Sequence, residues 1–96
     1  MVVGTGKVTL HLPSNRSLKG KRQVVRSIIE RVRSRFDVAI AEVDGQDLWQ
    51  VAVLGLACVS NDAHHAHEIL SHVLSFIATV RSEAEVTDYE TEILHL

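Results

Sequence analysis

A chain of 96 residues, with 46% hydrophobic residues and a formal net charge of −2, has enough material for one domain, residues 1–96, around one core. No run approaches the roughly 18 to 20 apolar residues that cross a bilayer, and residues 1–7 lack a basic leader followed by an apolar stretch. We therefore expect no membrane or export signal. Cys58 is the single cysteine and cannot form an intramolecular disulfide, so we expect a cytoplasmic protein.

The small net charge conceals a strong separation of sign along the chain. Residues 16–35 contain eight of the ten lysines and arginines with Glu30 as their only acid, whereas the other residues contain two bases and eleven acids. A protein that needs only solubility mixes both signs, so a concentrated basic segment is typical of a polyanion-binding surface. The basic residues of the segment are Arg16, Lys19, Lys21, Arg22, Arg26, Arg31, Arg33 and Arg35.

The first two elements follow from the spacing of apolar residues. Apolar and polar residues alternate from Val8 to Leu12, and the alternation stops at Pro13, which predicts a strand with one apolar face. Ser17 is a candidate N-cap, and apolar residues then recur at helical spacing up to Phe36. We therefore expect a first helix that begins after Ser17 and ends near Phe36.

A hairpin is predicted next. A strand from about residue 38 to 43 leads into the turn-rich tetrad 44–47, and residues 48–59 are then apolar at nearly every position. The second arm of the hairpin is therefore expected to be a central strand of a sheet.

A second helix and a last strand complete the chain. Ser60, Asn61 and Asp62 are successive N-cap candidates for an amphipathic helix that continues to Val80. A strand is expected from about residue 86 to 94. Its alternation places Tyr89, Thr91 and Ile93 on one face, expected to be core, and Asp88, Glu90 and Glu92 on the other, expected to be solvated.

The resulting order βαββαβ predicts the fold class. Right-handed crossover connections make the ferredoxin-like split βαβ sandwich the default architecture for this order. We expect an α+β protein with a four-stranded antiparallel sheet ordered 4-1-3-2 and both helices on one face.

The basic residues of the first helix fall mainly along one flank of its apolar stripe. At about 100° per residue, Lys19, Arg22, Arg26 and Arg33 form a row. Basic side chains in the first turn interact unfavourably with the positive end of the helix dipole, and a bound phosphate would make this arrangement favourable. Gly20 would allow close approach of the backbone. The alternative is a set of ordinary solvated side chains. The predicted anion- or nucleic-acid-binding residues are Arg16, Ser17, Lys19, Lys21, Arg22, Arg26 and Arg33.

Three stretches of the chain resemble a known family. Residues 17–22 (SLKGKR), 41–50 (AEVD and, after two residues, DLWQ) and 59–62 (VSND) are similar to signature stretches of the YlxP-like family, also called domain of unknown function 503. The resemblance covers nearly the whole chain. It implies a small cytoplasmic bacterial protein with a ferredoxin-like fold and no established activity. It also implies a link to ribosome maturation or translation, because family members are often encoded beside translation initiation factor two and ribosome-binding factor A.

The third strand is expected to be apolar on both faces, although helices cover only one face of such a sheet. Trp49, Val51 and Val53 alternate with Leu48, Ala52 and Leu54 along it. A homodimer that packs two sheets together would cover the open face, and a partner protein is the second possibility. Alternatively, Trp49 only caps the edge of the sheet. The predicted interface residues are Trp49, Val51 and Val53.

Two clusters of titratable residues give weaker signals. His64, Glu68 and His72 lie on one line of the second helix and would permit zinc or nickel ligands, but an outward-facing line has no walls, so a solvated face is the preferred interpretation. The acids of residues 42–47 lack the spacing of a calcium loop, and turn formation accounts for Asp44 and Gly45. We assign no metal, no cofactor and no catalytic residue.

Three functional hypotheses remain, in descending order. The first is a non-catalytic RNA- or ribosome-associated protein that meets phosphates through the first helix, because the first strand lacks the aromatic residues on which an RRM stacks bases. The second is a protein-interaction or assembly module that acts through the apolar face of the sheet. The third is an enzyme or small-ligand sensor, for which the sequence contains no catalytic signature.

Overall fold

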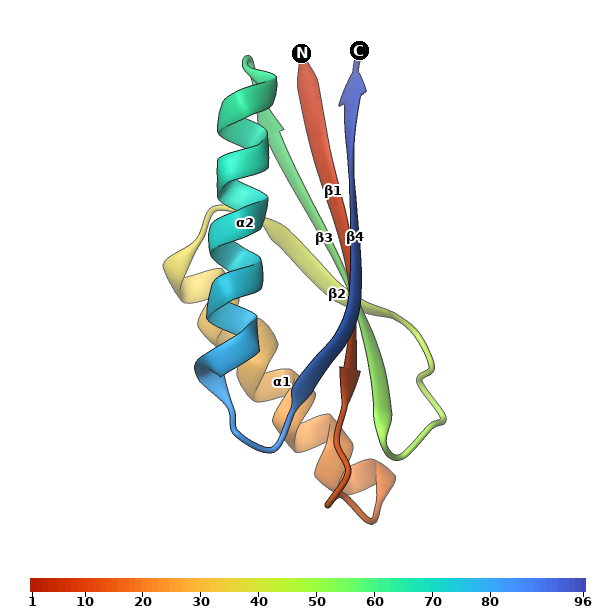
Figure 1. Cartoon of the computed structure of the whole chain (residues 1–96). Helices are drawn as coiled ribbons and strands as arrows, with labels where there is room; N and C mark the ends of the chain where they lie inside the picture. Colours follow the sequence, from red (N-terminus) through yellow and green to blue (C-terminus); the bar gives the residue numbers. More distant parts are fainter.

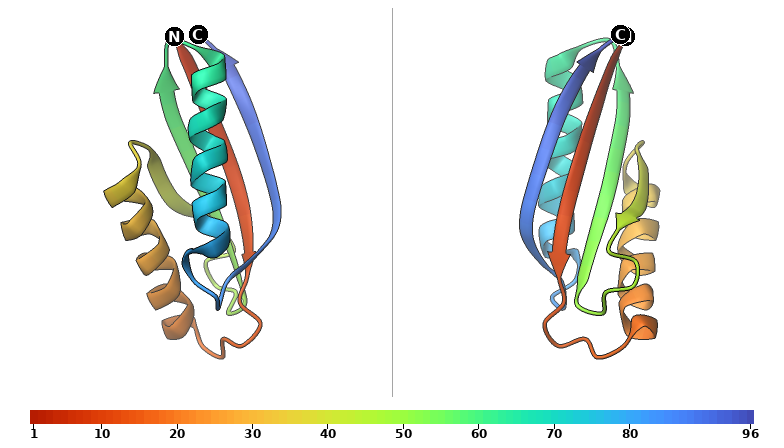
Figure 2. Two further views of the ribbon diagram at one scale, coloured as in Figure 1. Left: turned by 60° about the vertical axis from the view of Figure 1, so that its left-hand side comes forward. Right: turned by 90° about the vertical axis from the view of Figure 1, so that its right-hand side faces the viewer.

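Four strands and two helices alternate along the chain in the order βαββαβ (Figure 1). The computed structural model describes all residues from Met1 to Leu96. The strands form one antiparallel sheet ordered β2-β3-β1-β4, and both helices lie on one side of it (Figure 2). The predicted α+β ferredoxin-like fold is therefore confirmed. The elements are β1 (Val2–His11), α1 (Leu18–Arg35), β2 (Ala39–Asp44), β3 (Val51–Ser60), α2 (Ala63–Val80) and β4 (Glu85–His95).

The core lies between the helices and the side of the sheet that faces them. Alternate residues of β1 and β3 point to this side, and Val8, Leu10 and Leu54 are fully buried there. From the helices, Ile28 of α1 and Leu70 of α2 are buried equally deeply. One continuous hydrophobic cluster of 17 buried residues thus joins sheet and helices. Neither helix is both long and apolar enough to span a membrane.

The first strand begins at Val2, well before the predicted start at Val8. Gly4 and Gly6 weaken its sequence signal, because they occupy positions where the alternation would otherwise show apolar side chains. A Cβ atom on Gly4 would lie 3.1 Å from both Cys58 Sγ and Leu70 Cδ1. The glycine therefore allows α2 to pack closely on β1.

Both helices start at residues that the sequence offers as caps. Ser17 Oγ accepts a hydrogen bond from Gly20 N at 3.0 Å, which confirms the predicted start of α1. Asp62 caps α2, accepting from His64 N at 3.2 Å. Ser60 ends β3, and its Oγ accepts from Asp62 N at 3.1 Å. Of the three candidates, Asp62 is the cap of the helix and Ser60 closes the strand.

The hairpin differs from the prediction at its second arm. Strand β3 begins at Val51, so Leu48 and Trp49 belong to the loop of residues 45–50 and not to the strand. The loop carbonyls accept hydrogen bonds from side chains elsewhere in the chain, including Lys21 and Asn15, instead of continuing the ladder. Although residues 48 and 49 are apolar, the strand does not extend over them, because side chains from elsewhere in the chain bind the loop backbone.

The last strand follows the predicted alternation, but the burial of its core face is incomplete. Tyr89 pairs with Val8 and Ile93 with Gly4, so both residues face the helices. Tyr89 is nevertheless 60% exposed, because β4 is an edge strand that α2 covers only in part. The acids at positions 88, 90 and 92 lie on the open face, as predicted.

Candidate functional site: the basic surface of helix α1

Three arginines of the predicted row share a groove between α1 and the edge strand β2. The groove has a volume of about 440 Å³, and Arg22, Arg26 and Arg33 line it together with Ala41 and Glu42 of β2. Arg33 donates a hydrogen bond to Ile40 O at 3.0 Å, which holds its guanidinium at the strand. The helical spacing thus correctly places these arginines side by side.

Most of the predicted bases remain free to meet an anion. Arg16 and Lys19, around the start of α1, are exposed and form no ion pair or hydrogen bond within the protein. Arg22 and Arg26 in the groove are equally exposed and unpartnered. Glu30 and Glu42 also line the groove, but neither pairs with an arginine there, so the bases still outnumber the acids and favour phosphates. Their role in binding stays a prediction.

Lys21 is an exception, and its prediction as an anion ligand is wrong. Its side chain is fully buried, and Nζ donates to the carbonyl oxygens of Gly45 (2.7 Å), Gln46 (3.1 Å) and Val51 (3.2 Å). Nζ also lies 3.0 Å from Glu42 Oε2. The ammonium therefore forms its hydrogen bonds inside the protein, where it links the hairpin loop to α1.

The first turn of α1 also differs from a phosphate cradle. A Cβ atom on Gly20 would lie 2.3 Å from Asn15 Oδ1, so the space beside this glycine accommodates Asn15. Asn15 Nδ2 in turn donates to Ser17 O at 2.7 Å. The expectation that Gly20 admits an anion is wrong for this reason. Ser17 acts as the helix cap, and its part in anion binding stays a prediction.

The predicted interface residues separate into two places. Val51 and Val53 belong to β3 and are half-buried on the face of the sheet that the helices leave open. Val59, on the same face, is 67% exposed. Trp49 instead projects from the loop of residues 45–50 and is 56% exposed. Its placement on the third strand is therefore wrong, and sheet packing does not account for its exposure.

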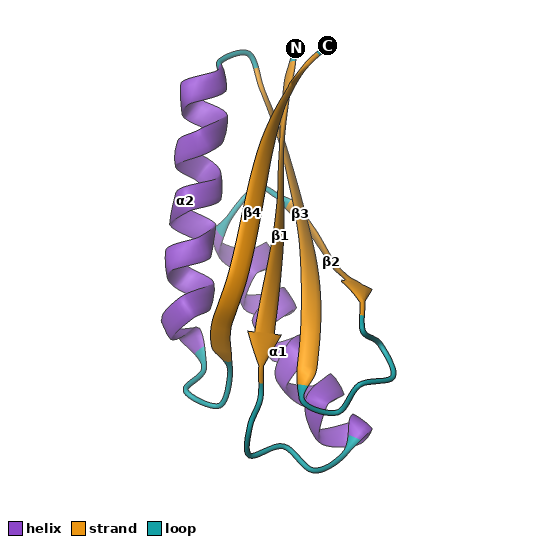
Figure 3. Ribbon diagram, turned by 45° about the vertical axis from the view of Figure 1, so that its right-hand side comes forward, coloured by secondary structure: helices purple, strands orange, loops and turns teal.

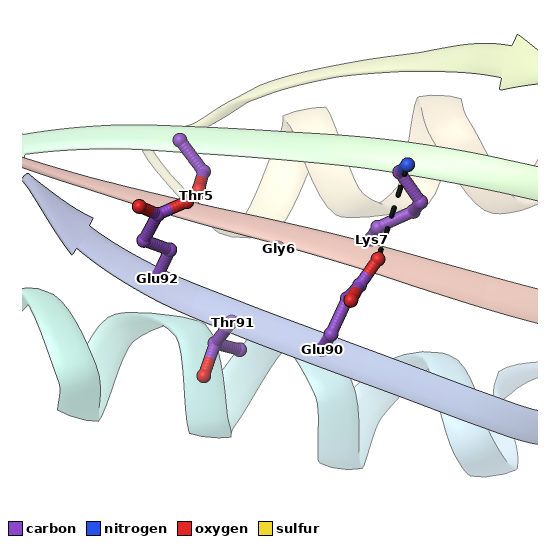
Figure 4. Close-up of a pocket in the computed structure, with 6 residues that line it drawn as sticks. All are labelled: Thr5, Gly6, Lys7, Glu90, Thr91 and Glu92. Carbon is purple, nitrogen blue, oxygen red and sulfur yellow. Dashed lines mark ion pairs between the residues drawn. The ribbon is translucent and has the colours of Figure 1, made fainter.

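Polar residues surround a hollow on the open face between β1 and β4 (Figure 4). Lys7 Nζ points toward Glu90 and lies 3.9 Å from its Oε1, and Glu92 lies beside Thr5. Thr91 points to the helix side instead. Lys7 and Glu90 are both largely exposed, so this ion pair is a weak surface contact that leaves the acidic row of β4 mostly uncompensated.

The histidines of α2 do not converge on a common centre. His64 Nε2 lies 2.9 Å from Glu68 Oε1, but no three His, Cys, Asp or Glu residues gather closely enough to hold a metal ion. Ser60 Oγ lies 3.3 Å from His65 Nδ1, and no carboxylate contacts His65 to orient it. This contact therefore lacks the third member of a catalytic triad.

Sequence reasoning missed Asn15, Gln50 and the partnership of Lys21 with Glu42. Gln50 Nε2 donates to Pro13 O and Asn15 O, both at 3.1 Å, and joins the two loops at this end of the molecule. For Lys21 a signal was present. It lies four, seven and eleven residues before Val25, Ile28 and Val32, on the apolar stripe of the helix.

The fold and the exposed bases on α1 define a small ferredoxin-like α+β protein with a basic helix surface. Residues 3–91 match the family described as a protein of unknown function (DUF503), and the chain belongs to this family. The predicted resemblance is thereby confirmed. The uncharacterised protein YlxP of Bacillus subtilis strain 168 is 41% identical over 76 residues, which are 79% of this chain and 82% of YlxP.

Two solved structures have a similar arrangement of elements. One, from Deinococcus radiodurans, is provisionally named an antibiotic biosynthesis monooxygenase; it is 19% identical with a TM-score of 0.46, over 100% of this chain and 92% of the other. The second is a dimeric ferredoxin-like protein from an uncultured marine organism. It is 11% identical with a TM-score of 0.46, over 98% of this chain and 94% of the other.

Proposed function

We propose that this protein is a non-catalytic RNA- or ribosome-associated binding protein that contacts phosphates through α1. The observation that carries the proposal is a set of four exposed, unpartnered bases, three on α1 and one just before its N-cap, in a protein whose net charge is −2. These bases are Arg16, Lys19, Arg22 and Arg26. The buried, unpaired thiol of Cys58 supports a reducing compartment such as the cytoplasm.

The distribution of charge across the sheet supports an orientation for the bound polyanion. Strand β2, which borders the arginine groove, and strand β4 form opposite edges of the sheet. The open face of β4 carries Asp88, Glu90 and Glu92, which repel phosphates. A nucleic acid is therefore steered to the α1–β2 side of the molecule and away from β4.

Such contacts predict strong salt dependence with little sequence preference. Each neutralised phosphate of a single strand contributes about −0.7 to the slope of log K against log salt concentration. Four contacts therefore predict a slope of roughly −3. Binding carried by apolar or shape contacts alone would change little with salt.

The test uses fluorescently labelled RNA, anisotropy and two double variants of equal charge change. Arg22→Gln with Arg26→Gln removes two charges from the groove, whereas Arg31→Gln with Arg35→Gln removes two from the opposite flank of the same helix. Because Arg31 donates to Val80 O and Arg35 lies over the Phe76 ring, circular dichroism must show that the second pair keeps the fold. We expect the first pair to weaken binding about tenfold or more and to reduce the salt slope by roughly 1.4, with little effect of the second pair. Equal effects of both pairs, or no binding of the parent protein at 50 mM salt, would overturn the proposal.

A second candidate function, assembly through the open face of the sheet, is favoured by exposed apolar side chains. Val43 is 48% and Val59 67% exposed there, and Val3 pairs with Val59 across β1 and β3. Burying such a face against a second copy is the simplest way to cover it. We expect a dimer in sedimentation at tens of micromolar and a monomer for Val53→Lys. A monomeric parent protein would exclude the homodimer.

A further inference from the structure

The single tryptophan of the chain lies beside the start of the basic helix. Trp49 projects from the loop of residues 45–50 and lines a surface hollow of about 420 Å³ together with Arg16 and Asn15. Leu48, Gln50 and Val51 complete the hollow. The structure thus brings a half-exposed indole next to the first base of the proposed phosphate-binding surface.

The loop that carries Trp49 is fixed by hydrogen bonds to its backbone. Asn15 Nδ2 donates to Trp49 O, and Gln50 O accepts from Leu12 N at 2.8 Å. Lys21 holds three further carbonyls of residues 45–51. Figure 3 shows this loop and the β1–α1 loop together at the end of the molecule opposite the termini. The exposure of Trp49 is therefore a property of an ordered loop that presents its ring.

The charge around Trp49 favours an anionic ligand over an apolar one. Arg16 is the only charged residue that lines the hollow, and neither Asp44 nor Asp47 of the same hairpin contributes to it. Arg16 lies two residues before α1, whose exposed Arg22 and Arg26 line the groove beside β2. Proteins that bind unpaired nucleotides combine an aromatic ring, on which a base stacks, with basic side chains that neutralise the phosphates.

We propose that Trp49 is a stacking platform for an unpaired base of single-stranded RNA, whose phosphates follow Arg16, Arg22 and Arg26. The inference rests on the proposed function and adds the class of ligand, single-stranded RNA, because bases inside a duplex are already stacked on one another and cannot stack on the ring. An apolar protein segment that covers Trp49 and Leu48 is the competing occupant.

The test compares two labelled oligonucleotides with equal numbers of phosphates, a twelve-nucleotide uridine strand and an abasic strand of the same length. Because the chain contains one tryptophan, its fluorescence reports Trp49 directly. We expect the uridine strand to quench this fluorescence and to bind about tenfold tighter than the abasic strand. Trp49→Leu is expected to abolish the difference, whereas Gln46→Ala, in the same loop but outside the hollow, leaves it intact.

The outcomes separate this inference from the proposed function. If both strands bind equally well and with the expected salt slope, and Trp49 is not quenched, the stacking platform is excluded while phosphate binding by α1 stands. Equal weakening of both strands by Trp49→Leu also excludes it. If neither strand binds in dilute buffer, the proposed function fails, and an apolar protein segment becomes the favoured ligand of the hollow at Trp49. Far-UV circular dichroism of each variant confirms that the fold is retained.

Discussion

Lys21 Nζ lies 3.0 Å from Glu42 Oε2, and this ion pair joins the first turn of α1 to β2 beneath the hairpin loop. Three backbone carbonyls use the three N–H donors of the ammonium, so the carboxylate contributes its charge without a well-formed hydrogen bond at this oxygen. In the most basic segment of the sequence, Lys21 therefore stabilises the fold, whereas several neighbouring basic residues are exposed and free to bind a ligand.

Replacing Lys21 by methionine is expected to destabilise the protein strongly. The variant leaves Glu42 without a counter-charge and three carbonyls without a donor, and breaking a buried pair of this kind costs about 3–5 kcal/mol. Urea denaturation followed by circular dichroism measures the change. Lys19→Met, two positions earlier and exposed, is the matched control and should shift the free energy of unfolding by less than about 0.5 kcal/mol. Similar losses for both variants would contradict the assignment.

Asn15 and Gly20 are predicted to be coupled. Replacing a helical glycine by alanine ordinarily stabilises a protein by about 0.5–1 kcal/mol, but a Cβ on Gly20 would meet Asn15 Oδ1 at 2.3 Å. Gly20→Ala is therefore expected to destabilise by roughly 1–2 kcal/mol, because Asn15 must leave its hydrogen bonds to Ser17 O and Trp49 O.

A double-mutant cycle checks this coupling. Once Asn15→Gly has removed the side chain, Gly20→Ala should become neutral or stabilising, which gives an interaction energy of about 1 kcal/mol or more. Additive losses in urea denaturation would show that the two residues act independently.

The sequence is a good guide to elements whose signals are local. Helix α1 begins after Ser17 and ends at Arg35, next to the predicted Phe36, because its cap and its apolar stripe both depend on neighbouring residues. Leu48 and Trp49 were wrongly assigned to β3, since donors more than twenty residues away determine where that strand begins. Long-range hydrogen bonds of this kind leave no periodic trace in a sequence.

The same limit applies to the candidate site. Charge counting treats Lys21 and Arg22 alike, although the first is fully buried and the second is exposed. The partner that decides the difference, Glu42, lies on another element, and nothing in the spacing of the acids marks it. The row formed by Arg22, Arg26 and Arg33 could be predicted because positions on one helix have fixed relative directions.

Glu83 is expected to titrate far below an ordinary glutamate. Arg81 donates hydrogen bonds to both of its carboxylate oxygens and lowers the pKa of Glu83 from 4.5 to about 2. Because the folded-state pKa is lowered, the stabilising contribution is present above the unfolded-state pKa and is lost as pH falls through about 2. Side-chain NMR titration measures the pKa directly, and Arg81→Gln should return it toward 4.5. An unchanged value in that variant would contradict the pairing.

Cys58 is expected to react slowly with thiol reagents as long as the protein is folded. Its side chain is 3% exposed, its Sγ lies 3.8 Å from Ala66 O, and α2 covers it at the point where Gly4 allows close packing. A reagent such as a chromogenic disulfide must therefore wait for an opening of the sheet–α2 interface, so native labelling should be at least about 100-fold slower than labelling in urea. Val59→Cys in a Cys58→Ala background is the control, because position 59 is exposed on the open face and should react at once. Immediate labelling of the native parent protein would show that α2 does not close over the sheet in solution.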